Sequence, residues 1–230
     1  MTRTLAMIAA TAALAFGAFW ALNTPQSSSS GADLLISPAN AQAAAELDIA
    51  SIPEMSQGNP DAAVTLIEYA SFTCPHCARF HLGPYQQLKA DYIDTGKINY
   101  IYREVYFDPF GVWASALARC GDGPERFFGM VDALYSSTDT WIVRSASGAP
   151  DPAAIADQLR KLGRIAGIPN DQLEACMTDE TRMRTLVAWY QANAEADGIE
   201  STPSFVLNGK RYENMPYEDL SALIEKALGN

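Results

Sequence analysis

Two cysteines separated by two residues are the side chains in this sequence best able to do chemistry. Cys74 and Cys77 enclose Pro75 and His76 in the tetrad CPHC. Cysteines at this spacing can close and reopen a disulfide with little movement of the chain, so the tetrad predicts thiol exchange. An apolar run over residues 64–70 precedes it and a helical pattern follows, which places Cys74 where a strand passes into a helix. The free N–H groups and the dipole of a helix N-terminus favour a thiolate there.

A metal site is the main alternative for the same residues. Cys74, Cys77 and His81 could supply three zinc ligands. The spacing favours redox chemistry, because no second C-x-x-C pair occurs and Cys120 and Cys176 stand alone in separate helical segments. A cysteine hydrolase is weaker still, because both histidines lie close in sequence to Cys74 and no separate segment carries a base.

The segments next to the tetrad predict a β-α-β unit. Residues 62–70 are apolar on both faces, which is typical of a central strand buried on two sides. The helix after the cysteines contains Gly83 and Pro84, so we expect it to be kinked. Residues 97–104 alternate as a second strand, and such a unit should be right-handed with parallel strands.

Helices are expected through the middle of the chain, from about residue 111 to residue 198. Asp151 and Pro152 predict an N-cap followed by proline at the first helical position, and Asn170 and Asp179 are predicted to cap two more helices. No strand pattern interrupts this region.

Strands return near the C-terminus. Residues 204–207 and 210–212 flank Asn208 and Gly209, the signature of a two-residue hairpin, and a last helix is predicted over residues 217–227.

The N-terminal segment predicts export. Arg3 precedes an uncharged run over residues 5–22, and a Ser-rich spacer at 27–30 and A-x-A cleavage sites at 39–43 follow. A cleaved signal and a retained membrane anchor both fit this pattern, since 18 residues of helix reach about 27 Å. Either one places the folded part outside the cytoplasm, where disulfides persist.

Composition restricts the class of protein. The 230 residues are 48% hydrophobic and 10% aromatic, which is enough for one sizeable core. The net charge is -11 and no Lys/Arg cluster occurs, so we expect no nucleic-acid partner. Because two unpaired thiols would be a liability in an oxidising compartment, we expect Cys120 and Cys176 to be bonded to each other.

Two longer motifs point to a known family. The segments EYASFTCPHC and STPSFVLNG, with a helical region between them, resemble the DsbA family of periplasmic thiol-disulfide oxidoreductases. The resemblance covers residues 61–230, and the extra cysteine pair resembles the alphaproteobacterial type. It implies an α/β thioredoxin fold, a central mixed sheet flanked by helices, interrupted by an all-helical domain.

The domain boundaries that follow are expectations from this resemblance and the patterns above. They are a signal or anchor with its spacer at 1–43, a first thioredoxin part at 44–110, an inserted helical domain at 111–188 and a second thioredoxin part at 189–230.

The resemblance also implies roles for the residues of the two motifs. Cys74 would be the nucleophile and Cys77 the resolving cysteine, while Pro203 would be a cis-proline beside the disulfide. Thr202 would direct its backbone toward a bound peptide. Pro75 and His76 between the cysteines favour an oxidant over a generic thioredoxin-like protein.

Two titratable residues are assigned to tuning the cysteines. His76 can stabilise the Cys74 thiolate through its N–H groups and partial positive charge; the alternative is an ordinary exposed histidine at a helix start. Glu68 lies six residues before Cys74 within an apolar strand, and in the family a charged residue there assists proton transfer at the resolving cysteine. Its alternative is a strand-end carboxylate that reaches water.

The implied function is disulfide introduction into newly exported proteins in the periplasm. Substrates would be unfolded or extended polypeptides with free cysteines, and a membrane oxidase of the DsbB type would return the electrons to quinone. We expect a monomer that needs no soluble cofactor and no metal. Within thiol chemistry, the alternative is an isomerase or reductase of the same superfamily. Such isomerases usually carry a dimerisation domain, and we expect none before residue 61. Outside thiol chemistry, the alternative is a Cys/His metal-binding module.

Overall fold

The computed structural model describes residues 47–121 and 123–230. The expected export segment, its Ser-rich spacer and the A-x-A sites lie outside these residues. Among the helices that are described, none is both long enough and apolar enough to cross a bilayer.

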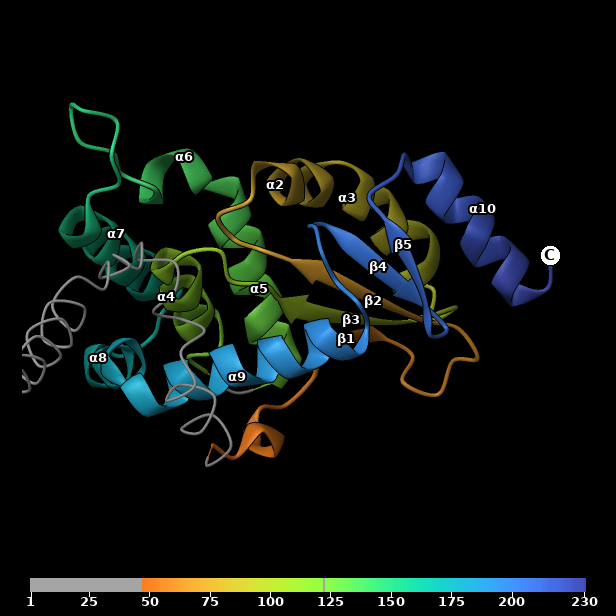
Figure 1. Ribbon diagram of the computed structural model, residues 1–230, viewed down its shortest axis with the longest axis horizontal. Helices are drawn as coiled ribbons and strands as arrows, with labels where there is room; N and C mark the ends of the chain where they lie inside the picture. Colours follow the sequence, from red (N-terminus) through yellow and green to blue (C-terminus); the bar gives the residue numbers. More distant parts are fainter. Residues whose placement is uncertain (1–46, 122) are drawn as a thin grey trace, which may run out of the picture. The chain divides into compact units, whose positions relative to one another are not determined.

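A mixed five-stranded sheet organises the fold (Figure 1). The strand order is β1-β3-β2-β4-β5, so β2 is central, parallel to β3 and antiparallel to β4. This confirms the predicted parallel β-α-β unit and the mixed sheet. The strands are β1 Met55–Gly58, β2 Thr65–Ala70, β3 Asn99–Glu104, β4 Ser204–Leu207 and β5 Lys210–Glu213.

The edge strand β1 escaped the sequence analysis. It has only four residues, and only Met55 among them is buried, so its sequence shows no alternating pattern. It is recognisable through its partner, because it pairs antiparallel with β3.

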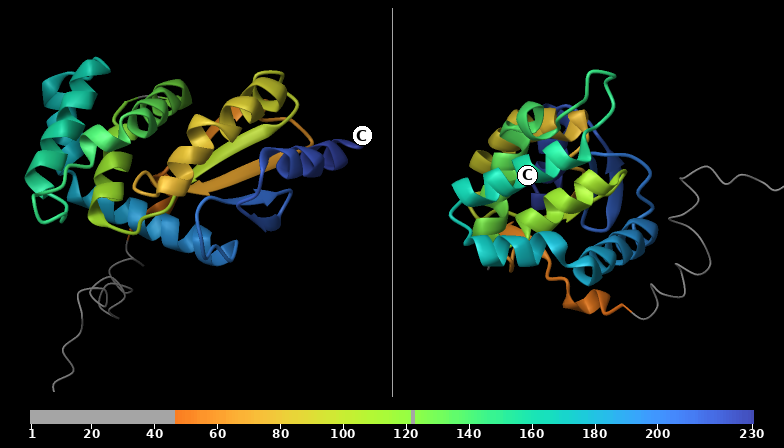
Figure 2. Two further views of the ribbon diagram at one scale, coloured as in Figure 1. Left: turned by 90° about the horizontal axis from the view of Figure 1, so that it is seen from above. Right: turned by 90° about the vertical axis from the view of Figure 1, so that its left-hand side faces the viewer.

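Helices surround the sheet and fill the segment between β3 and β4 (Figures 1 and 2). They are α2 Pro75–Leu82, α3 Pro84–Leu88, α4 Pro109–Ala118, α5 Gly123–Ser136, α6 Thr138–Trp141, α7 Pro152–Ile165, α8 Asn170–Thr178, α9 Glu180–Ala196 and α10 Tyr217–Leu228, with a 3₁₀ turn η2 at Ile49–Ser51 and a π-helical turn η3 at Lys89–Ile93.

The central strand sends alternate side chains to opposite faces. Leu66 and Ala70 belong to the main core, which also contains the buried hydrophobic residues of α2 and α3. Tyr69 belongs to a smaller core on the α9 side, where its hydroxyl donates to the carbonyl oxygen of Asn193 at 3.2 Å. Glu68 shares the face of Leu66 and Ala70, so it points toward the helix that carries the cysteines.

The predicted kink after the cysteines is a complete break. Helix α2 ends at Leu82 and α3 begins at Pro84, with Gly83 outside helical geometry at φ -128° and ψ -90°. Proline has no N–H to donate and its ring crowds the preceding turn, so the first helix stops there.

Two of the three predicted helix caps are present. Asp151 accepts from the N–H of Ala154, and Asp179 accepts from the N–H of Arg182. The prediction for Asn170 was wrong: Pro169 occupies the N-cap position of α8 in an extended conformation, and Asn170 is already the first helical residue.

The predicted hairpin is confirmed. Leu207 pairs with Lys210, which leaves Asn208 and Gly209 as the two turn residues. Their φ angles are 47° and 82°, the left-handed values that a type I′ turn requires and that Asn and Gly tolerate best.

The helical region between β3 and β4 carries a disulfide. Cys120, just after α4, is bonded to Cys176 in α8, with Cα atoms 5.6 Å apart. Helix α9 continues without interruption through the boundary expected between residues 188 and 189. The thioredoxin-type sheet and the helical region therefore share one long helix.

A buried ion pair joins the sheet to the helical region. Arg119, after α4, donates from Nε and Nη2 to both carboxylate oxygens of Glu104 at the end of β3, at 2.6 and 2.7 Å. Both side chains are fully buried. The Arg119 guanidinium also donates to the carbonyl oxygen of Pro53 at 2.9 Å and lies against the rings of Phe127 and Trp189.

We predict that Arg119→Met destabilises the protein by about 3–5 kcal/mol, because it leaves the Glu104 carboxylate buried without its partner. Urea unfolding at pH 7 measures this. The double variant Arg119→Met/Glu104→Leu is the control, and it should lose much less because no charge remains buried. A single variant within about 1 kcal/mol of wild type would show that the pair does not hold the two regions together.

Candidate active site

Cys74 lies at the junction that the sequence predicts. It is the N-cap residue of α2, with extended backbone angles of φ -87° and ψ 119°, and Pro75 occupies the start of the helix. Proline at this position has no N–H to leave unpaired and its fixed φ suits the helix. Cys74 is half-buried, and its thiol is free in this structure.

Hydrogen bonds to the sulfur hold the pKa of Cys74 low. The thiol of Cys77 is the strongest donor, followed by the Thr202 side chain and the backbone N–H groups of Cys77 and His76; partial burial opposes them, and the pKa of Cys74 falls to about 5. At neutral pH Cys74 is therefore a thiolate.

Cys77 has the opposite character. Its side chain is buried and carries a free thiol, and burial is the main reason that its pKa lies far above the usual value for a thiol. The backbone N–H of Ser71 points at its sulfur, 3.5 Å away. The tetrad thus combines an ionised outer sulfur with a protonated inner one.

The two distal residues of the second motif lie beside the cysteines. The peptide bond between Thr202 and Pro203 is cis, and Pro203 is buried immediately before β4. The carbonyl oxygen of Thr202 is 3.6 Å from the sulfur of Cys74. Thr202 lowers the pKa of both cysteines. Its hydroxyl is buried and has no partner within hydrogen-bond geometry among the described residues.

His76 stands on the exposed side of the helix start. Its ring Nδ1 lies 2.9 Å from Nη2 of Arg79, one turn further along α2. What reaches the sulfur of Cys74 is the backbone N–H of His76. The His76 ring therefore contacts Arg79, and the His76 backbone N–H contacts the Cys74 sulfur. A direct effect of the ring on the pKa of Cys74 remains a prediction.

Glu68 is buried, so the alternative of a strand-end carboxylate in water was wrong. Its side chain is 1% exposed, and the hydroxyl of Tyr100 donates to Oε2 at 2.5 Å. Burial raises the pKa of Glu68 to about 8, and the Tyr100 hydrogen bond opposes this only in part. The other oxygen, Oε1, is buried without a partner in the described part of the chain.

The burial of Glu68 predicts a pH-dependent cost. Because its folded pKa is raised, stability is complete below about pH 4.5 and is lost as the pH rises through about 8. We expect the free energy of unfolding of wild type to fall by about 3 kcal/mol relative to that of Glu68→Gln between pH 5 and pH 8. Urea unfolding across this range measures the difference, and parallel pH profiles would contradict it.

The sequence analysis missed the contacts that fix the loop before the tetrad. Thr73 donates to Oδ2 of Asp108 at 2.7 Å, and Oδ1 of the same carboxylate caps α4 by accepting from the N–H groups of Phe110 and Gly111. This ties the cysteine loop to the helical region. Asp108 before Pro109 is a recognisable N-cap signature, but its link to Thr73 spans 35 residues and has no local signal.

The tyrosine beside Glu68 was also missed. Tyr100 and Tyr102 alternate with less buried residues on β3, which does predict that both face the same side of the sheet. The sequence does not show that this side is the one that Glu68 faces; the register of β2 against β3 decides it.

His81, the third candidate zinc ligand, lies 2.6 Å from Asp132 through its Nε2. Across 47–121 and 123–230, no three side chains of His, Cys, Asp or Glu converge as a metal site would require.

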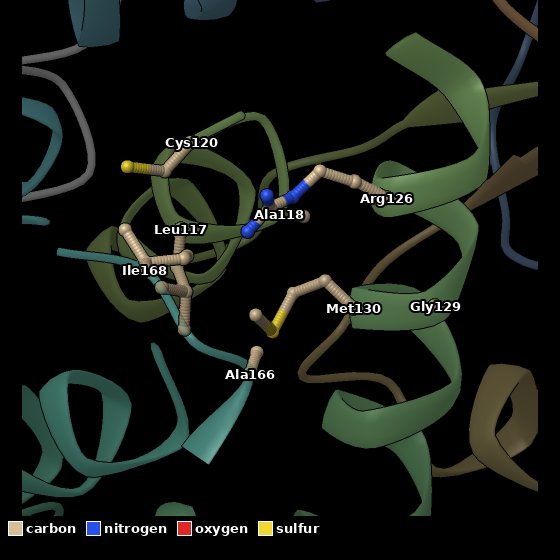
Figure 3. A pocket seen from close by; sticks show the side chains of 8 residues that line it. All are labelled: Leu117, Ala118, Cys120, Arg126, Gly129, Met130, Ala166 and Ile168. Atoms are coloured by element: carbon tan, nitrogen blue, oxygen red, sulfur yellow. The ribbon is translucent and has the colours of Figure 1, made fainter. Parts of the chain in front are cut away.

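A cavity of about 270 Å³ lies in the helical region and not at the tetrad. Figure 3 shows Met130 and Ile168 lining it, with Arg126 and Cys120 beside them. Its lining includes none of the residues assigned to thiol exchange. At the tetrad Pro75 and His76 are exposed and Cys74 is half-buried, so the outer cysteine can be reached from solvent.

Comparison with known sequences gives one family for most of the chain. The family model described as Thioredoxin matches residues 50–226. A Rickettsia bellii protein that carries the provisional name protein-disulfide oxidoreductase is 33% identical over 175 residues, covering 76% of this chain and 64% of that protein. The chain thus spans less than two thirds of the length of this relative.

Solved structures agree on the fold. The crystal structure of Wolbachia pipientis alpha-DsbA1 superposes with a TM-score of 0.69 at 27% identity, covering 77% of this chain and 92% of that one. Oxidised BdbD from Bacillus subtilis has a TM-score of 0.64 at 20% identity, covering 77% and 94%, and supports the fold alone.

Proposed function

Since the chain belongs to the thioredoxin family and is DsbA-like, we propose that it is a thiol-disulfide oxidoreductase that introduces disulfide bonds into newly exported proteins. The observation that carries this proposal is the opposite character of the two sulfurs, with the pKa of Cys74 lowered to about 5 and that of Cys77 strongly raised. Stabilising the thiolate of the reduced form makes the disulfide form a stronger oxidant.

The reaction begins with the Cys74–Cys77 disulfide. A substrate thiolate attacks the Cys74 sulfur, the Cys74–Cys77 bond breaks, and the electron pair leaves on the Cys77 sulfur, which takes up a proton. A second substrate thiolate attacks the substrate sulfur of the mixed disulfide. The substrate leaves oxidised by two electrons, with Cys74 as thiolate and Cys77 as thiol.

The properties of each sulfur suit its role in these reaction steps. Cys74 is the better leaving group in the second step, because a thiol of low pKa departs readily as a thiolate. Cys77 is inaccessible to a substrate, so attack is directed to Cys74. The backbone of Thr202, beside Cys74, is placed to pair with an extended substrate segment.

The remaining parts of the proposal are the setting and the partners. Substrates are unfolded or extended polypeptides with free cysteines, and the setting is the periplasm. A quinone-linked membrane oxidase of the DsbB type returns the Cys74–Cys77 pair to the disulfide. The pair itself carries the electrons, so no soluble cofactor takes part, and a monomer suffices.

Two assays test this function and separate it from isomerisation, the first with the oxidised protein and the second with the reduced protein, whose Cys74 thiolate is needed to attack a scrambled disulfide. One follows thiol loss in a reduced, unfolded substrate protein, and the other follows recovery of activity from the same protein with scrambled disulfides. We expect stoichiometric oxidation within seconds to minutes and little recovery from the scrambled form. Efficient rescue of the scrambled substrate with slow oxidation would overturn the proposal in favour of an isomerase.

A further inference from the structure

His81 is a buried titratable side chain that the exchange chemistry above does not use. It is 1% exposed, and its Nε2 lies 2.6 Å from Oδ1 of Asp132 on α5. The Asp132 side chain is 59% exposed, so this end of the pair reaches solvent. The other ring nitrogen, Nδ1, is buried and has no protein partner among the described residues.

Tyrosines connect the histidine to the cysteine site. The His81 ring stacks on Tyr85 of α3 and lies against Tyr135 of α5, with ring centroids 4.4 and 4.8 Å away. Tyr135 shares a 2.7 Å hydrogen bond with Tyr102 and donates to the carbonyl oxygen of Ser71, the residue whose N–H points at Cys77. The ring that packs on His81 is thus one residue removed from the inner sulfur.

Glu68 borders the same tyrosines. Tyr100, whose hydroxyl donates to Glu68, packs against Tyr85 with ring centroids 5.4 Å apart. Burial raises the pKa of Tyr85, and the charges of Asp132 and Glu68 raise it further. Tyr85 therefore lies within the electrostatic reach of both carboxylates. Glu68 Oε1 and His81 Nδ1 are both buried without protein partners in the described residues.

We propose that the His81–Asp132 pair is the port through which protons pass between solvent and two buried groups, the Glu68 carboxyl and the Cys77 sulfur. An imidazole suits this task because it can take a proton at one nitrogen and release one from the other. The inference rests on the proposed function, since it concerns the proton that each exchange step moves.

Each sulfur-exchange step is coupled to the transfer of one proton. When the Cys74–Cys77 bond breaks, the Cys77 sulfur takes the proton of Glu68, and the Glu68 carboxylate recovers one proton from solvent by way of Asp132, His81 and the tyrosine layer. In the reverse direction Glu68 first releases its proton to solvent by the same route, and the Cys77 thiol then passes its own proton to the Glu68 carboxylate as its sulfur attacks the mixed disulfide, so that Glu68 ends protonated. One proton moves per sulfur step, and His81 ends each step unchanged.

The groups that face His81 come from two helices. Asp132 and Tyr135 face it from α5, and Tyr85 faces it from α3, while Gln86 of the same helix binds its carbonyl oxygen at 3.0 Å. Asp132 is the only carboxylate among these contacts. Replacing the His81 ring by phenylalanine keeps the stacking surface and removes both nitrogens.

The test measures both directions of exchange with glutathione between pH 5 and pH 9, in His81→Phe and Asp132→Asn. A proton port changes the rate constants of exchange and does not change the relative free energies of the oxidised and reduced forms. We expect both the forward and the reverse rate constants to fall by the same factor, about tenfold, with an altered pH profile and an unchanged reduction potential. The exposed Asp139→Asn on α6 is the matched control, because it removes an equal charge from a side chain outside the site and should match wild type.

Several results would overturn the proposal. Rate constants within about twofold of wild type in Asp132→Asn would do so even if His81→Phe failed to fold. A changed reduction potential or a changed Cys74 titration would show that the pair shapes the site and does not carry protons. Failure of the proposed function is distinguishable, because wild type itself would then not oxidise substrate thiols.

Discussion

Replacing Cys77 with serine should turn the protein into a trap for disulfide partners. Without the inner sulfur, a mixed disulfide formed at Cys74 cannot be resolved from within, and dithiol oxidation should drop to background. Cys74→Ser should form no adduct, because the remaining Cys77 is buried and its pKa is strongly raised. Mass spectrometry after incubation with oxidised glutathione reads out both variants; an adduct on Cys77 in Cys74→Ser would reverse the assigned roles.

A matched pair of variants separates the loss of the sulfur from the loss of its hydrogen bond. The Cys77 side chain is the strongest cause of the low pKa of Cys74. Serine retains a donor at that position and alanine does not. The pKa of Cys74 should therefore rise in Cys77→Ala and stay close to wild type in Cys77→Ser, as followed by thiolate absorbance. Equal titrations would show that the Cys77 donor does not set the pKa.

The reduced form should gain stability over the oxidised form as the pH rises from 5 to 8. The folded pKa of Cys74 is depressed from 9.0 to about 5, so the stabilisation is complete above about pH 9 and is lost as the pH falls through about 5. Three pH units correspond to about 4 kcal/mol, and solvent screening at a half-exposed sulfur reduces this to about 2 kcal/mol.

Urea unfolding of both redox forms at several pH values checks this prediction. The difference between the two forms is the quantity to follow, because groups such as Glu68 titrate in both and cancel. The closed loop of the disulfide adds an offset that does not vary with pH. A difference that is constant between pH 5 and pH 8 would show that the Cys74 thiolate contributes nothing to the stability of the reduced form.

Local signals in the sequence predicted much of this site. The tetrad at the start of a helix, the strand that carries Glu68 and the Asn208-Gly209 turn each encode their geometry in adjacent residues. Resemblance to a known family supplied what spacing could not, namely that Thr202 and Pro203, far along the chain, meet Cys74. The order of residues along the chain does not predict the contact of Thr202 and Pro203 with Cys74.

The surroundings of the inner sulfur could not be predicted in the same way. Tyr100 reaches Glu68 across 32 residues, and His81 reaches Asp132 across 51. A strand or helix pattern shows which side of an element is buried, but the partner depends on sheet register and helix packing. For this reason His81 was predicted only as a possible metal ligand or hydrolase base, and its contact with Asp132 was not predicted.

The reduction potential of the Cys74–Cys77 pair tests the proposed mechanism most directly. The protein is equilibrated with glutathione buffers of known ratio at pH 7, and the fraction of the disulfide form is measured after acid quenching. Stabilisation of the Cys74 thiolate predicts a potential near that of a strong oxidant, about -120 mV. A potential near about -270 mV, as in a thioredoxin-like reductant, would contradict the assignment of this protein as an oxidase.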